Sequence, residues 1–218
     1  MQVAFLPGIQ AQPVRRALLV GCGLLLLAAA VIPFDGLVSG AISAALPDGH
    51  VVRETCTRLQ EIVAPEYVVI AGLPLVLSRN WWRYLLGFAV PWAILAAPLH
   101  GLKFAIGRAR PQLDRGAYAF EPFAGFQQGM DSFPSGHVAQ AVLLALLLST
   151  FYPWTRWLAW PLAAAVAIAR VAQERHFVSD VSAGAALALG CYAVSRLWLG
   201  VGCYPLPRVS LQSASNSK

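Results

Sequence analysis

Long uninterrupted apolar blocks constrain the fold of this chain more than any other feature of its sequence. Hydrophobic residues make up 58% of the 218 residues and charged residues only 12%, and the apolar residues are gathered into blocks instead of alternating with polar ones. A bilayer core holds no water to bond backbone groups, so only helices and closed barrels cross it, and barrel strands need alternating residues. The blocks therefore predict an all-α integral membrane protein.

Six of these blocks are predicted membrane spans, and together they predict one compact domain over residues 1–218. Several are shorter than the ~20 residues that a full crossing requires, and the fifth is the shortest. Residues 209–218 form a polar tail that is predicted to be disordered. The predicted spans are Ala17–Pro33, Ile62–Leu77, Tyr84–Leu99, Val138–Tyr152, Trp157–Ala169 and Val181–Leu199.

The charged residues indicate how the six spans are oriented. If the N-terminus is cytoplasmic, all the charged residues of the cytoplasmic segments are basic, and every Asp and Glu falls on the opposite side. This is the positive-inside pattern, so both termini are predicted to be cytoplasmic. Orientation and contact with anionic lipid account for the net charge of +6 without a nucleic-acid partner. The cytoplasmic basic residues are Arg15, Arg16, Arg79, Arg83, Arg156, Arg196, Arg208 and Lys218.

Two polar segments are predicted to lie on the outer face. The first, between the third and fourth spans, contains "KFAIGRARP" (103–111) and ends in "FPSGH" (133–137). The second, "RVAQERHFVSD" (170–180), lies between the fifth and sixth spans. Successive spans alternate in direction, so the two segments share a face if all six blocks cross the bilayer.

Each segment contains a motif that has both a functional and a structural interpretation. If Pro134 opens a helix with Ser135 in its first turn, free backbone N–H groups face an anion, although a turn capping a buried helix explains the same residues. His176 and Asp180 are four residues apart, the spacing that brings side chains together on one helical face. The carboxylate would then bond one imidazole nitrogen and leave the other with its lone pair, or the pair would only tie helices together.

Cations and titratable groups recur at the predicted outer ends of the spans, which favours the functional interpretation. Ionisable residues are expensive to bury at membrane depth, so they are candidates for function. A tetrahedral dianion would satisfy all of these groups together. The cations are Lys103, Arg110 and Arg170, the anion-binding turn is Ser135 with Gly136, and the titratable groups are His137 and His176.

The ordered set of motifs resembles the three-part signature of the type 2 phosphatidic acid phosphatase superfamily. The signature reads Lys-x6-Arg-Pro, then Pro-Ser-Gly-His, then Arg-x5-His-x3-Asp. It is matched by Lys103, Arg110 and Pro111, by residues 134–137, and by Arg170, His176 and Asp180. Ala169 stands where the family often has Ser. The superfamily includes bacterial phosphatidylglycerophosphate, undecaprenyl diphosphate and lipid A phosphatases, glucose-6-phosphatase and the soluble vanadium haloperoxidases.

The resemblance implies a role for each matched residue. His176 would be the nucleophile that forms a phosphohistidine, with Asp180 fixing its tautomer, and His137 would protonate the leaving group and then activate water. The remaining matched residues would hold the phosphate oxygens, namely Lys103, Arg110, Arg170, Ser135 and Gly136. Arg108, which is outside the signature, is expected to face lipid headgroups or solvent.

The implied activity is hydrolysis of a lipid phosphate monoester or diphosphate, without metal or cofactor, at the periplasmic side of a bacterial inner membrane. The substrate stays open among phosphatidylglycerophosphate, phosphatidic acid, undecaprenyl diphosphate and lipid A, and so does the oligomeric state. A non-enzymatic lipid-phosphate carrier would need the cations but not the aligned histidines. A haloperoxidase would use the same pocket for vanadate, but those relatives are soluble and larger.

Overall fold

A computed structural model describes residues 7–45, 54, 57–58, 65–77, 80–125, 127–200 and 203–204. Over these ranges the chain is helical, and the only extended pairing is an isolated bridge between Arg108 and Phe120, which confirms the all-α prediction. The predicted disordered tail, residues 209–218, lies outside the described residues. The α-helices are α1 (Pro7–Val31), α2 (Asp35–Ala45), α4 (Pro65–Gly72), α5 (Trp81–Ile106), α6 (Gly136–Phe151), α7 (Arg156–Ala172) and α8 (Val178–Leu199). Short 3-10 segments are η1 (Ile32–Phe34), η2 (Leu73–Leu77), η3 (Pro111–Leu113) and η4 (Pro153–Thr155).

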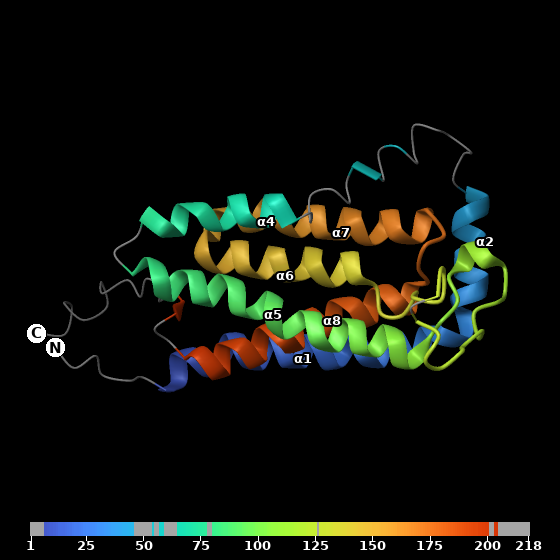
Figure 1. The fold of residues 1–218 in the computed structure, drawn as a ribbon, viewed down its shortest axis with the longest axis horizontal. Coiled ribbons are helices and arrows are strands. Elements are labelled where there is room, and N and C mark those ends of the chain that lie inside the picture. Colours follow the sequence, from blue (N-terminus) through green and yellow to red (C-terminus); the bar gives the residue numbers. More distant parts are fainter. Residues whose placement is uncertain are drawn as a thin grey trace, which may run out of the picture.

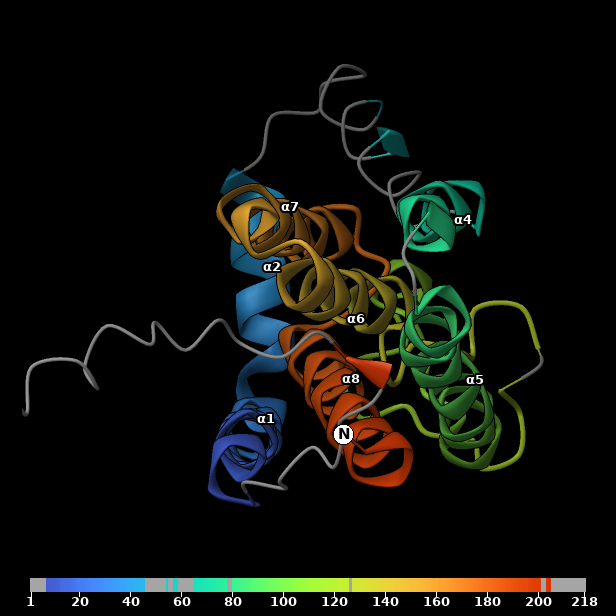
Figure 2. The ribbon, with the colours of Figure 1, turned by 90° about the vertical axis from the view of Figure 1, so that its left-hand side faces the viewer.

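The helices form an elongated bundle around α8. Figure 1 shows α1, α4, α5, α6, α7 and α8 running lengthwise, with α2 turned across one end. Seen along the bundle, α6 and α8 lie in the middle, with α1 and α7 on one side and α4 and α5 on the other (Figure 2). Helix α8 contacts α1, α5, α6 and α7, and α2 contacts α7 and α8. A central helix in contact with five others is well placed to position groups from distant parts of the chain.

The described parts of the apolar blocks are helical as predicted; the start of the second predicted block, residues 62–64, lies outside the described residues. Three helices are long and apolar enough to cross a membrane. These are Pro13–Ile42, Trp81–Ile106 and Val178–Leu199, while Gly136–Phe151 is apolar but shorter. The first apolar stretch extends beyond the predicted limit at Pro33, because η1 and α2 continue it. Large apolar side chains such as Leu26, Trp157 and Ile168 are exposed on the outside of the bundle, as expected where lipid is the surrounding solvent. The count of six crossings stays a prediction.

A glycine at the end of α5 turns the chain back over the bundle end. Gly107 has a left-handed φ of 55°, caps α5 by donating to Lys103 O over 3.0 Å, and accepts from Glu121 N over 2.8 Å. A Cβ at this position would overlap the carbonyl of Glu121, so the turn needs glycine. Gln112 N then donates to Glu174 O over 3.0 Å, which joins this loop to the α7–α8 connection. The two polar segments therefore meet at the α2 end of the bundle (Figure 1).

Candidate active site

The two cations of the first motif converge at the end of α5. Lys103 lies in the last turn of this helix and Arg110 follows in the loop. Both bond the carboxylate of Asp131, since Lys103 Nζ lies 3.3 Å and Arg110 Nη2 2.7 Å from Asp131 Oδ2. Lys103 Nζ also donates to the main-chain oxygen of Asp131 over 2.6 Å. Two predicted phosphate ligands thus surround one point, and an acidic side chain occupies it.

Asp131 was not among the predicted site residues. Its carboxylate has the same sign of charge as phosphate, so a search for phosphate ligands passes over it. The available signal was its place in the sequence, directly before the Ser-Phe-Pro-Ser-Gly-His segment and next to the second motif. Only the fold reveals that it faces Lys103, 28 residues away in the chain.

The second motif places an unpartnered hydroxyl beside α8. Helix α6 begins at Gly136 with Ser135 as its N-cap, so Pro134 precedes the helix and does not open it as predicted. Ser135 Oγ is buried, makes no capping bond, and has no hydrogen-bond partner among the residues that the structure describes. Arg110 Nε is also buried without a hydrogen-bond partner among these residues. Buried polar atoms normally have partners, so these two are candidates for ligand contacts.

Helix α8 sets the position of this turn. Ser135 N donates to Asp180 O over 3.0 Å. Gly184, one turn further along α8, allows the close approach, because a Cβ there would lie only 2.5 Å from Ser135 O. The predicted phosphate-binding turn and the third motif are therefore packed directly against each other.

His176 is held as a buried neutral imidazole. Its Nδ1 lies 2.7 Å from the carbonyl oxygen of Ser132, which can only accept, so Nδ1 carries the proton and Nε2 has a lone pair. This lone pair accepts a long hydrogen bond, 3.4 Å, from Arg170 Nη2. Burial, together with the charges of Arg170, Lys103 and Arg110, lowers the pKa of His176 well below its usual value of 6.5. The nitrogen expected to attack phosphorus therefore has its lone pair and lies next to a predicted phosphate ligand.

The role expected of Asp180 requires a correction. Asp180 Oδ2 is 3.9 Å from His176 Nδ1, beyond hydrogen-bond distance, and the tautomer is set by the Ser132 carbonyl instead. The carboxylate accepts from Ser132 Oγ over 2.6 Å and from Phe177 N over 2.9 Å. The reason is that His176 precedes α8 and does not share a helical face with Asp180, so the carboxylate orients His176 through its neighbours.

The expectation for Arg108 was wrong. Its side chain is fully buried, and its guanidinium lies 5.3 Å from the ring centroid of Phe120 and 4.3 Å from that of Phe177. It donates to Asp180 Oδ1 over 2.6 Å and to Asp35 Oδ2 of α2 over 2.9 Å. Its other acceptors are Ser179 Oγ at 2.6 Å and Ala117 O at 2.8 Å. Arg108 faces inward because two buried carboxylates, distant in sequence, require a shared cation.

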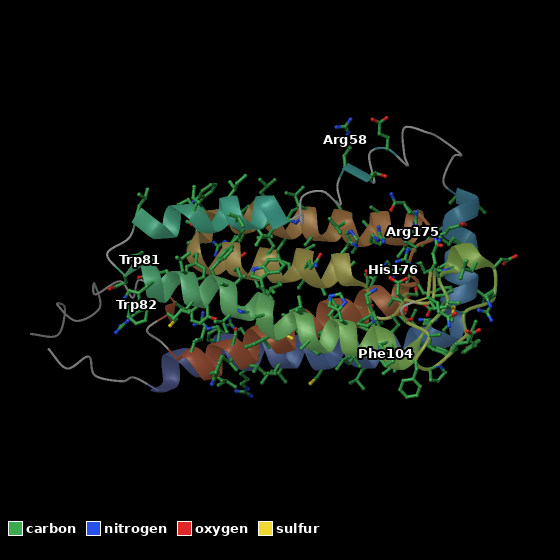
Figure 3. All side chains as sticks on the ribbon, in the orientation of Figure 1. Arg58, Trp81, Trp82, Phe104, Arg175 and His176 are labelled. Carbon is green, nitrogen blue, oxygen red and sulfur yellow. The ribbon has the colours of Figure 1, made fainter. Side chains whose placement is uncertain are left out.

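His137, the second predicted catalytic histidine, lies near the same centre. His137 is half-buried in the first turn of α6. It is close enough to Arg170, Lys103 and Arg110 to interact with their charges. Arg175, next to His176, is exposed. Figure 3 shows Arg175 and His176 toward the α2 end, with Trp81 and Trp82 at the opposite end.

Metal ligands are not grouped in the described part of the chain. No cluster of three or more His, Cys, Asp or Glu that would hold a metal occurs there. Cys22, Cys191 and Cys203 are free thiols, and Cys56 lies outside the described residues. The functional groups in the described part of the site are cations, imidazoles, hydroxyls and carboxylates.

Comparison with known proteins gives relatives of one kind. A lipid A 1-phosphatase of Porphyromonas gingivalis is 30% identical over 116 residues, which are 51% of this chain and 23% of that protein. A lipid A 1-phosphatase of Rhizobium johnstonii is 37% identical over 115 residues, 52% of this chain and 45% of that protein. The chain spans less than half the length of these curated relatives.

A solved structure and a family model extend the comparison to the fold. The crystal structure of a transmembrane PAP2-type phosphatidylglycerolphosphate phosphatase from Bacillus subtilis matches with a TM-score of 0.61 and 26% identity, over 84% of this chain and 94% of that one. The PAP2 superfamily model matches residues 71–201, which is more than half of the sequence and includes every motif described above. This chain is therefore a membrane protein that belongs to the PAP2 superfamily.

Proposed function

We propose that this protein is a phosphatase that removes phosphate from a membrane lipid monoester or diphosphate. The observation that carries the proposal is the position of His176, a buried neutral imidazole whose Nε2 lies 3.4 Å from Arg170. An unprotonated imidazole nitrogen, held only by a long hydrogen bond from a group that also binds phosphate, is the arrangement that nucleophilic catalysis requires. The lipid A 1-phosphatases and the phosphatidylglycerolphosphate phosphatase found as relatives support the same activity.

The reaction runs in two displacements. In the first, Lys103, Arg110 and Arg170 hold the phosphate oxygens, His176 Nε2 forms a bond to phosphorus, and the bond from phosphorus to the lipid oxygen breaks. That oxygen leaves with a proton from His137. In the second, His137 takes a proton from water, the water oxygen attacks phosphorus, and the phosphorus–nitrogen bond breaks to release inorganic phosphate and restore the neutral imidazole.

The surroundings of His176 stabilise the charge that it gains in the first step. Attack makes the imidazole positive, and the Ser132 carbonyl at 2.7 Å holds the Nδ1 proton throughout. The Asp180 carboxylate, 3.9 Å from Nδ1, adds an attractive charge without accepting the proton. Because these groups are already in place, little reorganisation is needed during the reaction.

The proposal includes an orientation and a first substrate. The proposed topology has six crossings with cytoplasmic termini, as the positive-inside pattern favours, and its site faces the periplasm from a bacterial inner membrane. Lipid A 1-phosphate is the first substrate to test, because curated relatives carry that activity in their names. Phosphatidylglycerophosphate is the second, because of the solved structural relative.

Phosphate release by the purified protein in detergent tests the proposal. A panel of lipid mono- and diphosphates should include at least one substrate that yields inorganic phosphate, and His176→Ala should yield none. Activity is expected to persist in EDTA and to be inhibited by vanadate, because the proposed steps use cations and imidazoles. Lipid-phosphate binding by the intact protein without release from any panel member would favour the carrier function instead.

A further inference from the structure

Asp131 is a carboxylate inside a site proposed to bind phosphate. We propose that Asp131 is a displaceable counterion: its carboxylate occupies Lys103 and Arg110 in the resting protein, and only a phosphate with sufficient charge takes its place. The proposal builds on the phosphatase function and adds a residue that determines which lipid phosphates enter. It makes Asp131 a filter between phosphate monoesters and the phosphodiester headgroups of ordinary phospholipids.

The contacts of Asp131 are those that a phosphate oxygen would make. Asp131 Oδ2 lies 2.7 Å from Arg110 Nη2 and 3.3 Å from Lys103 Nζ, so one oxygen bonds both cations. Meanwhile Arg110 Nε and Ser135 Oγ, both buried, are without hydrogen-bond partners among the described residues. Asp131 thus satisfies part of the resting site, while Arg110 Nε and the Ser135 hydroxyl are left unsatisfied, as expected if a larger anion bonds both sets of donors.

The geometry allows the carboxylate to leave without disturbing the cations. The side chain of Asp131 is 28% exposed, more than those of Lys103 (14%) and Arg110 (18%), so rotation toward solvent is open to it. Lys103 Nζ keeps a separate bond to the main-chain oxygen of Asp131 at 2.6 Å. The backbone of Asp131 therefore positions Lys103, and its carboxylate supplies only the counter-charge.

Charge determines what can displace it. Burial raises the pKa of Asp131, but Lys103 and Arg110 outweigh this effect and hold the pKa below its usual value of 3.8, so the group is a carboxylate at neutral pH. A phosphate monoester carries about −1.5 to −2 at neutral pH, whereas a diester carries a single charge. A monoester therefore competes with the carboxylate for the two cations far better than a diester does. In a bilayer composed of diester lipids, such a filter keeps the site available.

Two inhibition constants test the proposal. Asp131→Asn should bind inorganic phosphate more tightly, with its inhibition constant lower by about tenfold, because removing a competing charge near two cations is worth roughly one power of ten. Short-chain phosphatidylglycerol, a diester, should become an inhibitor of this variant although it hardly inhibits the wild type. Asp131→Glu, which keeps the charge, should behave like the wild type.

Glu121→Gln is the matched control. Glu121 is a carboxylate of the same loop that pairs with Arg115, and both side chains are about half exposed, so the substitution removes the same charge away from the site. It should change both inhibition constants less than about twofold, since exposed ion pairs interact weakly. A similar change in both variants would show that overall charge, rather than Asp131, is responsible.

Titration calorimetry with inorganic phosphate separates this inference from the proposed function. It is done on the full-length His176→Ala protein with and without Asp131→Asn, and it needs no turnover. Tighter phosphate binding with Asn supports the counterion role even if no tested lipid is hydrolysed. Unchanged or weaker binding with Asn overturns the inference, even if the wild type is an active phosphatase, and would make Asp131 a residue that positions the cations.

Discussion

At the scale of single residues, the site is defined by groups that hold His176 neutral and oriented. The Ser132 carbonyl fixes the proton on Nδ1, Arg170 faces Nε2, and Asp180 bonds Ser132 Oγ and Phe177 N. Arg108 in turn holds Asp180 in place. Each of these contacts has a measurable consequence.

The pH dependence of the reaction should reflect the lowered pKa of His176. Burial and nearby cations keep the imidazole neutral as the pH falls through 6.5, so the nucleophile is lost only at a much lower pH. Because kcat/KM reports groups of the free enzyme, its acidic limb should lie well below 6.5. His100→Gln, an exposed histidine of α5, should leave the profile unchanged. An acidic limb centred near 6.5 would mean that His176 titrates normally.

The two histidines should differ in phosphoenzyme formation. His176→Ala should form none, because it lacks the proposed nucleophile, whereas His137→Ala should still form phosphohistidine from an aryl phosphate whose leaving group needs little protonation. Acid-labile phosphoprotein after brief mixing with labelled substrate is the measurement. If His176→Ala is labelled and His137→Ala is not, the roles are reversed.

Removal of Arg108 should destabilise the protein and abolish activity. Arg108→Ala leaves Asp35 and Asp180 as buried carboxylates without their shared cation, which costs about 3–5 kcal/mol. Arg115→Ala, which breaks the half-exposed pair with Glu121, should cost less than about 1 kcal/mol. Thermal unfolding in detergent compares the two variants. Equal unfolding temperatures would show that the buried network contributes little.

At the scale of elements, the packing of α6 on α8 sets the geometry of the site. The N-terminus of α6 lies against α8 through the bond from Ser135 N to Asp180 O, and Gly184 makes room for it. The loop between α5 and α6 is tied to the α7–α8 connection by Gln112 and Glu174. A small displacement of one helix end therefore moves the phosphate-binding turn relative to His176.

Gly184→Ala should impair catalysis much more than it impairs folding. The added Cβ would lie 2.5 Å from Ser135 O and would push the turn away, and a displacement of about 1 Å in a catalytic site costs on the order of 100-fold in rate. Gly190→Ala is the control on the same helix, because its Cβ meets nothing within 4 Å and alanine favours helix. Comparable kcat/KM for both variants would remove Gly184 from this role.

At the scale of the whole molecule, the bundle separates two ends of different character. His176 lies toward the end that carries α2 and the α5–α6 loop, and Trp81 and Trp82 lie at the other (Figure 3). The positive-inside pattern predicts that the first end faces the periplasm and the second the cytoplasm. This assignment decides which leaflet supplies the substrate.

Cysteine labelling in spheroplasts tests the sidedness. After the four native cysteines are replaced, Tyr118→Cys in the exposed loop should react with an impermeant thiol reagent added outside. Asn80→Cys, at the exposed start of α5, should react only after the membrane is opened. The opposite pattern would invert the topology and place the site in the cytoplasm.

The sequence alone determined the helical membrane class, the helical blocks and the identity of the motif residues. Hydrophobic blocks and short-range motif spacing are local properties, so they can be seen without a fold. Tertiary structure decided which groups bond Asp180, that Arg108 is buried, and that Asp131 lies in the site. Arg108 meets Asp35 and Asp180 across 73 and 72 residues, and Lys103 meets Asp131 across 28. Such pairings follow from how helices pack, and buried charges choose partners in space, so no spacing in the sequence predicts them.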